Sequence, residues 1–139
     1  MNARIDHVVL WVADPLASVA FYEQILGLAP VRRELYAEGR APFPSVRVAD
    51  DAIVDLMPLA AAPLMNAMPG AGGSAGHPVN HLCLAMARGD YDALRARLDA
   101  RGIAVIQVLR DSFGARGEAP EAFYFGDPDG NVIEARYYA

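Results

Sequence analysis

The chain has 139 residues, of which 54% are hydrophobic and 21% are charged. This length fits one domain, and this composition is rich enough in apolar residues to bury a core, so a wholly disordered protein is excluded. The formal net charge is −5 and every basic residue is arginine, which argues against a nucleic-acid partner and excludes Schiff-base chemistry on a lysine.

The first half of the chain predicts a strand, a helix and three further strands. Residues 4–12 are rich in valine and isoleucine, as strands are. Asp14 is a good helix N-cap, and a helix is predicted from Pro15 to Gly27, where the glycine favours a stop. The three strands that follow are predicted near residues 30–36, 44–49 and 52–58.

The second half repeats this order after a Pro- and Gly-rich connector at 59–78. Residues 79–86 predict a strand, and Asp90 is placed to cap a helix that carries Tyr91, Leu94 and Leu98 on one face. Gly102 ends that helix. The last three strands are predicted at 103–109, 121–126 and 131–138, with a turn at 127–130.

This internal repeat decides the expected architecture. We predict an α+β fold in which two βαβββ modules form a curved, mostly antiparallel mixed sheet, with the helices outside. The whole chain, 1–139, is then one domain, with module one at about 4–58, the connector at 59–78 and module two at about 79–138.

Four ionisable residues occupy matched places in the repeat. His7 and His81 lie in the first strand of their modules, and Asp55 and Glu134 lie in the last strands. Because side chains alternate along a strand, each of the four shares its face with apolar neighbours. A single strand histidine or carboxylate is usually structural or solvated, but a matched set of four is better explained by a shared partner.

A divalent metal ion would satisfy all four groups at once. Imidazole and carboxylate are ligands for Fe, Zn, Ni, Co and Mn, and the sequence does not distinguish among these metals. The third histidine, His77, precedes a proline in the connector and is interpreted as a loop residue. The stretch Gly72–Gly76 matches G-x-S-x-G, but it lacks the flanking strand and helix of a nucleophile elbow and is interpreted as linker.

These features resemble the vicinal oxygen chelate superfamily. The resemblance is carried by RIDHVVLWVADP around His7, VNHLCLAM around His81 and FYFGDPDGNVIEARYY ending on Glu134, and it covers nearly the whole chain. The superfamily contains glyoxalase I, extradiol ring-cleaving dioxygenases, methylmalonyl-CoA epimerase, fosfomycin-resistance enzymes and metal-free bleomycin-binding proteins. The chain is most similar to small bacterial glyoxalase-domain proteins.

The resemblance implies a role for each matched position. It assigns His7, His81 and Glu134 as metal ligands, and Asp55 as the counterpart of a fourth ligand that is usually Glu. Because Asp is one methylene shorter, its carboxylate is withdrawn by roughly 1.5 Å and is expected to bind through water or to serve as a base. Tyr124 stands ten residues before Glu134, where fosfomycin enzymes carry a tyrosine, and is a further catalytic candidate.

The function implied is that of a metal-dependent lyase or isomerase. Its small-molecule substrate would present two neighbouring oxygens to the metal and react through a metal-stabilised enolate, with Asp55 or Glu134 moving the proton. Two alternatives stay open. An extradiol-type dioxygenase would use His7, His81 and Glu134 around Fe(II), and a binding or resistance protein would not be an enzyme.

Further expectations concern assembly, location and the single cysteine. The resemblance favours a homodimer, and whether each site is built from one chain or two stays open. The N-terminal segment has no signal-peptide pattern, and no apolar run reaches the roughly 18 residues of a transmembrane helix, so a cytoplasmic protein without a membrane partner is expected. Cys83 is the only cysteine and, from its apolar neighbours, is expected to be a buried thiol.

Overall fold

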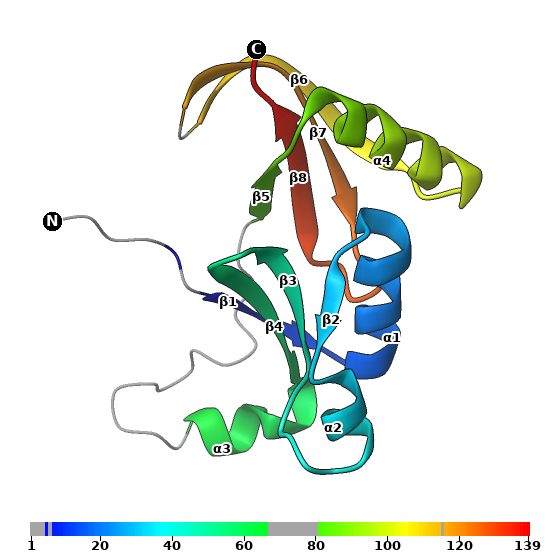
Figure 1. Ribbon diagram of the computed structural model, residues 1–139, viewed down its shortest axis with the longest axis vertical. Helices are drawn as coiled ribbons and strands as arrows, with labels where there is room; N and C mark the ends of the chain where they lie inside the picture. The colour runs from blue at the N-terminus through cyan, green and yellow to red at the C-terminus, as the bar shows by residue number, and fades with distance from the viewer. Residues whose placement is uncertain (1–4, 6, 67–80, 115) are drawn as a thin grey trace, which may run out of the picture. The chain divides into compact units, whose positions relative to one another are not determined.

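The structure is a computed structural model that describes residues 5, 7–66, 81–114 and 116–139. The chain divides into two compact units, Met1–Pro78 and Val79–Ala139. Each unit contains its own four-stranded sheet together with helices, as Figure 1 shows.

Unit one follows the predicted order of strand, helix and three strands. Its sheet has the strand order β1-β4-β3-β2, in which β1 pairs with β4 in parallel and the other pairs are antiparallel. The strands are β1 (His7–Val12), β2 (Ala29–Val31), β3 (Ser45–Ala49) and β4 (Ala52–Pro58). The helical elements are α1 (Pro15–Phe21), the π-helical turn η1 (Tyr22–Leu26), α2 (Arg33–Ala37), the 3₁₀ turn η2 (Leu59–Ala61) and α3 (Ala62–Asn66).

Unit two has the same topology. Its sheet has the order β5-β8-β7-β6, again with one parallel pair, β5 with β8, at one side. Its elements are β5 (Leu82–Ala85), α4 (Arg88–Ala100), β6 (Val105–Gly114), β7 (Gly117–Gly126) and β8 (Val132–Tyr137). The predicted α+β class with two βαβββ modules is therefore confirmed, and each module forms a mixed, open sheet of its own.

The ends of the first helix form as the sequence predicts. The Asp14 side chain accepts hydrogen bonds from the backbone N–H groups of Leu16 and Ala17 at 3.0 and 3.1 Å. These bonds satisfy two of the donors that a helix start leaves without partners. Gly27 has a φ of 73°, the left-handed conformation that glycine adopts without strain, and ends the helical segment.

Several local predictions differ from the structure; strands β6 and β7, for example, extend beyond the predicted 103–109 and 121–126. The strand expected at 30–36 ends at Val31, because Arg32 takes a left-handed φ of 58° and residues 33–37 turn into helix α2. The second long helix begins after Ala87 without a side-chain cap, so Asp90 lies in its first turn and does not cap it. The connector begins with two helical turns at 59–66, and its remainder, including His77, lies outside the described residues.

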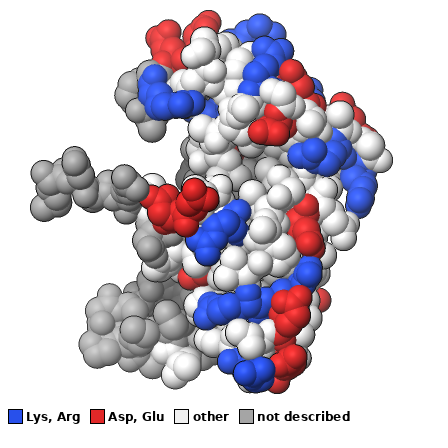
Figure 2. All heavy atoms as spheres, viewed as in Figure 1, with Lys and Arg blue, Asp and Glu red and all other residues white. Residues whose placement is uncertain are grey.

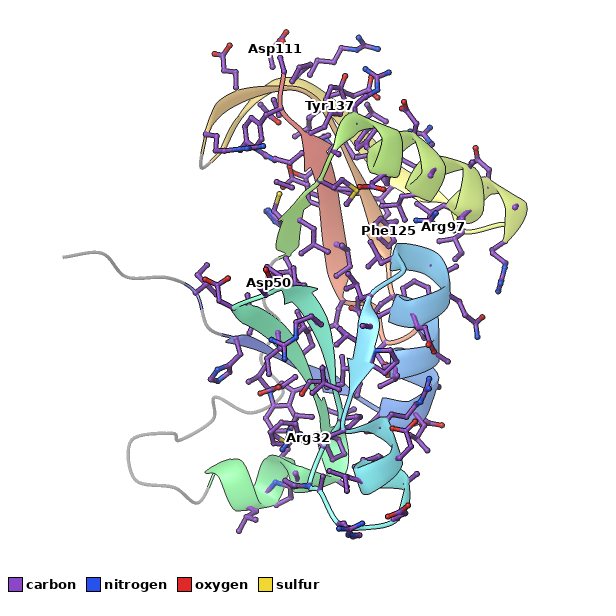
Figure 3. All side chains as sticks on the ribbon, in the orientation of Figure 1. Arg32, Asp50, Arg97, Asp111, Phe125 and Tyr137 are labelled. Atoms are coloured by element: carbon purple, nitrogen blue, oxygen red, sulfur yellow. The ribbon has the colours of Figure 1, made fainter. Side chains whose placement is uncertain are left out.

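Each unit buries one face of its sheet beneath a helix. In unit one, α1 packs against β4, and in unit two, α4 packs against β8. The predicted face of α4 is confirmed, since Tyr91, Leu94 and Leu98 are all buried. The core of unit one includes Leu10, Val12, Val19, Tyr22, Val46, Val54 and Leu56, and that of unit two includes Leu84, Phe123, Phe125, Ile133 and Ala135. Figure 3 shows the side chain of Phe125 on β7.

The turn between β7 and β8 is held by a buried aspartate. Asp127 Oδ1 accepts hydrogen bonds from the backbone N–H groups of Asp129 and Asn131 at 2.9 and 2.8 Å, and Oδ2 accepts one from the Asn131 side chain. The aspartate thus ties the start of β8 to the end of β7. These hydrogen bonds therefore hold in place the start of β8, the strand on which Glu134 lies.

The surface carries charges of both signs. On the face shown in Figure 2, arginines and acidic residues are interspersed, and no broad area of one sign appears. Among the helices described, none is long and apolar enough to cross a membrane.

Candidate metal centre

Glu134 lies in the middle of β8 and is almost completely buried, with a relative exposure of 1%. In the sheet register it stands between Cys83 of β5 and Tyr124 of β7. These three side chains share a face of the sheet, opposite the face that packs on α4. A buried carboxylate requires compensation, and two neighbours supply it.

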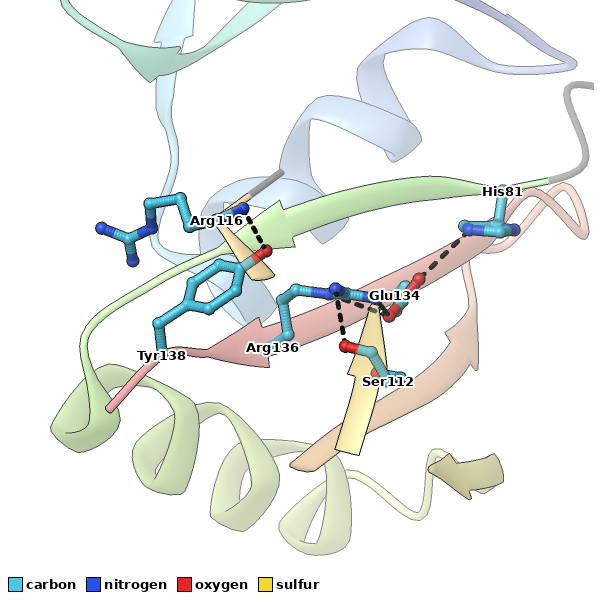
Figure 4. A network of polar contacts seen from close by, with 6 residues as sticks. All are labelled: His81, Ser112, Arg116, Glu134, Arg136 and Tyr138. Atoms are coloured by element: carbon cyan, nitrogen blue, oxygen red, sulfur yellow. Dashed lines mark hydrogen bonds and ion pairs between the residues drawn. The ribbon is translucent and has the colours of Figure 1, made fainter. Parts of the chain in front are cut away.

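Arg136 is the first of these neighbours. Its Nε and Nη2 groups both donate to Glu134 Oε1, the former at 3.1 Å, and its Nη1 group donates to the Ser112 carbonyl oxygen at 3.4 Å (Figure 4). The arginine itself is only 6% exposed. Burial, the largest single influence, opposes the charged guanidinium, but the hydrogen bond to Glu134 and the other favourable polar and charged contacts together raise the pKa of Arg136 above its ordinary value.

His81 is the second neighbour. It lies immediately before β5, so the predicted strand at 79–86 is shorter than expected, and residues 79 and 80 lie outside the described residues. His81 Nε2 is 3.1 Å from Glu134 Oε2, and its side chain is 35% exposed. Arg136 and His81 therefore contact different oxygens of the same carboxylate (Figure 4).

The distance between these two atoms is that of an ion pair, and it also suits two ligands of one divalent metal ion. Two ligands that each lie at roughly 2.0–2.2 Å from one ion are separated by about 3.0–3.4 Å in octahedral or tetrahedral geometry. The observed 3.1 Å between His81 Nε2 and Glu134 Oε2 lies in this interval. Imidazole nitrogen and carboxylate oxygen are also the donor types expected from the sequence.

Tyr124 borders this pair from β7. Its ring contacts the His81 ring edge-on, with the ring centroids 5.4 Å apart. Burial, and then its hydrogen bond with Glu134, raise the pKa of the Tyr124 phenol. A phenol whose pKa is raised stays protonated at neutral pH and can donate a proton or a hydrogen bond, whereas its role as a base is disfavoured.

The expectation that Cys83 is buried is wrong. The residue is solvent-accessible because its side chain lies on the face opposite α4. Partial loss of water around the sulfur, followed by the negative charge of Glu134, raises the pKa of the thiol to about 11. The thiol is thus neutral at physiological pH, the form in which a cysteine is a poor nucleophile.

Unit one contains the other two predicted ligands. Asp55 lies in β4, is 6% exposed and accepts a hydrogen bond from Ser45 Oγ at 2.6 Å. His7 is exposed and opens strand β1. The register pairs His7 with Ile53 and Val9 with Asp55, so the histidine and the carboxylate lie on the same face of the sheet, two register pairs apart.

The registers of the two units correspond residue by residue. In unit one the residue two places after His7, Val9, pairs with Asp55; in unit two the residue two places after His81, Cys83, pairs with Glu134. The matched placement of histidine and carboxylate that the sequence repeat predicts is therefore present in both sheets. Within neither unit do three of the described His, Cys, Asp or Glu side chains form a group tight enough to hold a metal.

Two strand arginines, Arg47 and Arg136, are candidates for holding an acidic part of a substrate. Arg47 instead reaches the turn after β3, where Nη1 donates to the Asp50 carbonyl oxygen at 3.2 Å and the side chain is exposed. Arg136 is engaged with Glu134, a contact that the sequence analysis missed. The signal for it is the spacing of two residues in one strand, which places Glu134 and Arg136 on the same face.

Known proteins with similar sequences and structures agree on one family. The model of the Glyoxalase/Bleomycin resistance protein/Dioxygenase superfamily matches residues 4–135. A virulence protein of Salmonella typhimurium, STM3117, is 30% identical over 138 residues, which are 97% of this chain and 84% of that protein. Its crystal structure matches with a TM-score of 0.76 at 25% identity, covering 100% of this chain and 99% of that one.

Two further similar structures are of proteins whose descriptions name an activity. A glyoxalase/dioxygenase from Nostoc punctiforme matches with a TM-score of 0.68 at 26% identity and covers 98% of this chain and 91% of its own. A lactoylglutathione lyase from Agrobacterium tumefaciens has a TM-score of 0.66 at 19% identity, with coverages of 98% and 94%, and at this identity the likeness shows the fold alone. With the family model matched over nearly the whole chain, this protein belongs to the Glyoxalase/Bleomycin resistance protein/Dioxygenase superfamily.

Proposed function

We propose that the protein is a metal-dependent lyase or isomerase acting on a small substrate that presents two neighbouring oxygens. The observation that carries the proposal is the pair His81 Nε2 and Glu134 Oε2, which lie 3.1 Å apart in a member of this superfamily. His7 is proposed as the third ligand because its place in the register of unit one matches that of His81 in unit two. A divalent ion bound there supplies Lewis-acid stabilisation of negative charge on the substrate oxygens.

Asp55 is proposed as the residue that moves the proton. Its contact with Ser45 Oγ is a hydrogen bond from a neutral group, whereas Glu134 receives two bonds from a guanidinium. Glu134 is thus engaged in the ion pair that holds it in place. Asp55 is the matched carboxylate left for proton transfer in this proposal, and the Tyr124 phenol is proposed as a hydrogen-bond donor.

A dioxygenase is the second candidate. Two histidines and one carboxylate are the set that holds Fe(II) in many oxygenases, and the Nostoc relative at 26% identity bears the description glyoxalase/dioxygenase. The lyase or isomerase ranks first because ring-cleaving enzymes usually add a further catalytic histidine, and the remaining histidine, His77, lies in the connector. We also propose that the protein acts as a cytoplasmic homodimer with no nucleic-acid or membrane partner.

The test begins with the metal. Untagged protein is purified without chelator and its metal content is measured by elemental analysis, with His81→Ala and Glu134→Ala as variants expected to lose most of it. Wild-type protein that carries no metal and takes up none on dialysis against Fe²⁺, Zn²⁺, Ni²⁺, Co²⁺ or Mn²⁺ would contradict the proposal and favour a non-enzymatic binding protein.

The second step separates the two reactions. The metal-loaded protein is incubated in D₂O with a panel of hydroxy- and oxo-carbonyl compounds, and loss of the C–H signal next to the carbonyl is followed by NMR. Exchange that needs the metal and disappears in Asp55→Ala supports the lyase or isomerase. Oxygen uptake with catechols, without such exchange, would instead establish the dioxygenase.

A further inference from the structure

We propose that Arg136 is a positioning residue that fixes Glu134 so that only its Oε2 atom is offered for metal binding. The inference rests on the proposed metal dependence and concerns the part of the site that lies within unit two. It assigns to Arg136 a role different from that of a substrate anchor.

The first argument is the geometry of the contact. Two N–H groups of Arg136, on Nε and Nη2, donate to the same carboxylate oxygen, Oε1. Two bonds from one planar guanidinium restrict the rotation of the carboxylate more than a single bond does. The other oxygen, Oε2, then lies 3.1 Å from His81 Nε2, a separation suited to two ligands of one ion.

The second argument is that Arg136 has little capacity left for a substrate. Its Nη1 group donates to the Ser112 carbonyl oxygen, and its side chain is 7% exposed. The hydroxyl of Tyr138, two residues further along the chain, accepts a hydrogen bond from the backbone N–H of Arg116 at 3.3 Å (Figure 4). An arginine that binds a substrate anion must present N–H groups at the surface, which this buried one does not.

The consequence concerns the strength of metal binding. Residues that orient a ligand without touching the metal typically contribute 10–100-fold to metal affinity. Without the guanidinium, the Glu134 carboxylate can rotate about its terminal torsion, and the ligand pair is no longer held at a fixed separation. We therefore expect Arg136→Met to weaken binding by about 10–100-fold, although the site gains negative charge.

The experiment compares three variants of the untagged, metal-stripped protein. Arg136→Met removes the guanidinium, Arg136→Lys keeps the charge but not the two-pronged contact, and Arg110→Met makes the same change at an ion pair whose arginine side chain is 76% exposed. Co²⁺ is the probe: its affinity is measured by calorimetric titration and its ligand geometry by the visible absorption of the bound ion. Urea unfolding of each metal-free variant measures stability separately.

The expected result has three parts. Arg136→Met binds Co²⁺ about 10–100-fold more weakly, with a changed absorption spectrum; Arg136→Lys lies between this variant and the wild type; and Arg110→Met matches the wild type. If Arg136→Met is too unstable to titrate, Arg136→Lys alone decides, because a Co²⁺ affinity and spectrum equal to those of the wild type would show that the two-pronged contact is not needed.

Other outcomes overturn the inference. A loss of stability in Arg136→Met with unchanged Co²⁺ affinity and spectrum would mean that the arginine is merely structural. Unchanged metal binding with weaker binding of an anionic substrate would restore the role of substrate anchor. If the wild-type protein binds no Co²⁺, the proposed function itself is contradicted. If the wild type binds Co²⁺ and the Arg136 variants bind it equally well, only the role of Arg136 is contradicted.

Discussion

Replacing Glu134 by glutamine tests how strongly the fold of unit two depends on the buried ion pair. The substitution keeps the size of the side chain and removes its charge. Arg136, at 6% exposure, then stays buried with its charge no longer balanced by the carboxylate that accepts two of its hydrogen bonds. Breaking such a pair from one side is much more costly than replacing both partners by apolar groups.

The expected magnitude follows from burial. Removal of one partner of a buried pair typically costs about 3–5 kcal/mol of the free energy of unfolding. The matched control is Glu23→Gln, which makes the same change in a pair with Arg33 whose two side chains are 40% and 38% exposed. Pairs that are this accessible to water contribute at most about 1 kcal/mol.

Urea unfolding of metal-free protein, followed by circular dichroism in the presence of a chelator, measures both effects. With a slope of about 2 kcal/mol/M, a loss of 4 kcal/mol lowers the unfolding midpoint by about 2 M, whereas the Glu23→Gln control shifts it by at most about 0.5 M. The reasoning fails if Glu134→Gln is no more destabilising than Glu23→Gln. Such a result would show that the Arg136 charge is balanced by its other contacts.

Three further predictions follow from the structure and from the proposed site. Asp55→Ala should keep most of the metal while turnover falls by roughly 10²–10⁴-fold, the usual contribution of a general base; metal loss as complete as in Glu134→Ala would make Asp55 a direct ligand. Because the pKa of Cys83 is about 11, its thiol is neutral at pH 8, and iodoacetamide should alkylate it about 100-fold more slowly at this pH than it alkylates a free cysteine. The alkylation rate of Cys83 should then rise about tenfold per pH unit up to pH 11. A rate that levels off near pH 9 would contradict this. Asp14→Ala should lower the free energy of unfolding by about 1 kcal/mol, measured in urea, because two N–H groups at the start of α1 lose their acceptor.

The fold was predictable because the two modules repeat one order of elements. Periodicity, the helix N-cap Asp14 and the helix stops Gly27 and Gly102 act locally, so they can be recognised in one sequence. Helix α2 was missed because its start depends on Arg32, a non-glycine residue with a left-handed φ of 58°. No residue pattern marks that conformation, which only the surrounding structure maintains.

The candidate site was predictable only in part. Strand alternation places Glu134 and His81 on one face, but it does not show which atoms approach each other. The sequence does not show that Arg136 is buried, because burial of an arginine depends on contacts from distant strands, here the Ser112 carbonyl of β6. The exposure of Cys83 was missed for the same reason, since apolar neighbours in sequence do not show which face of a sheet is covered.

The two modules share a topology and differ in how each supports its carboxylate. Asp55 and Glu134 occupy equivalent register positions, yet one is held by the Ser45 hydroxyl and the other by the Arg136 guanidinium. Hydrogen bonds from a charged guanidinium are stronger than a bond from a neutral hydroxyl, so Glu134 is held more firmly than Asp55. The duplicated fold thus keeps the position of the carboxylate and changes its support, which comes from the same strand in unit two and from the adjacent strand β3 in unit one.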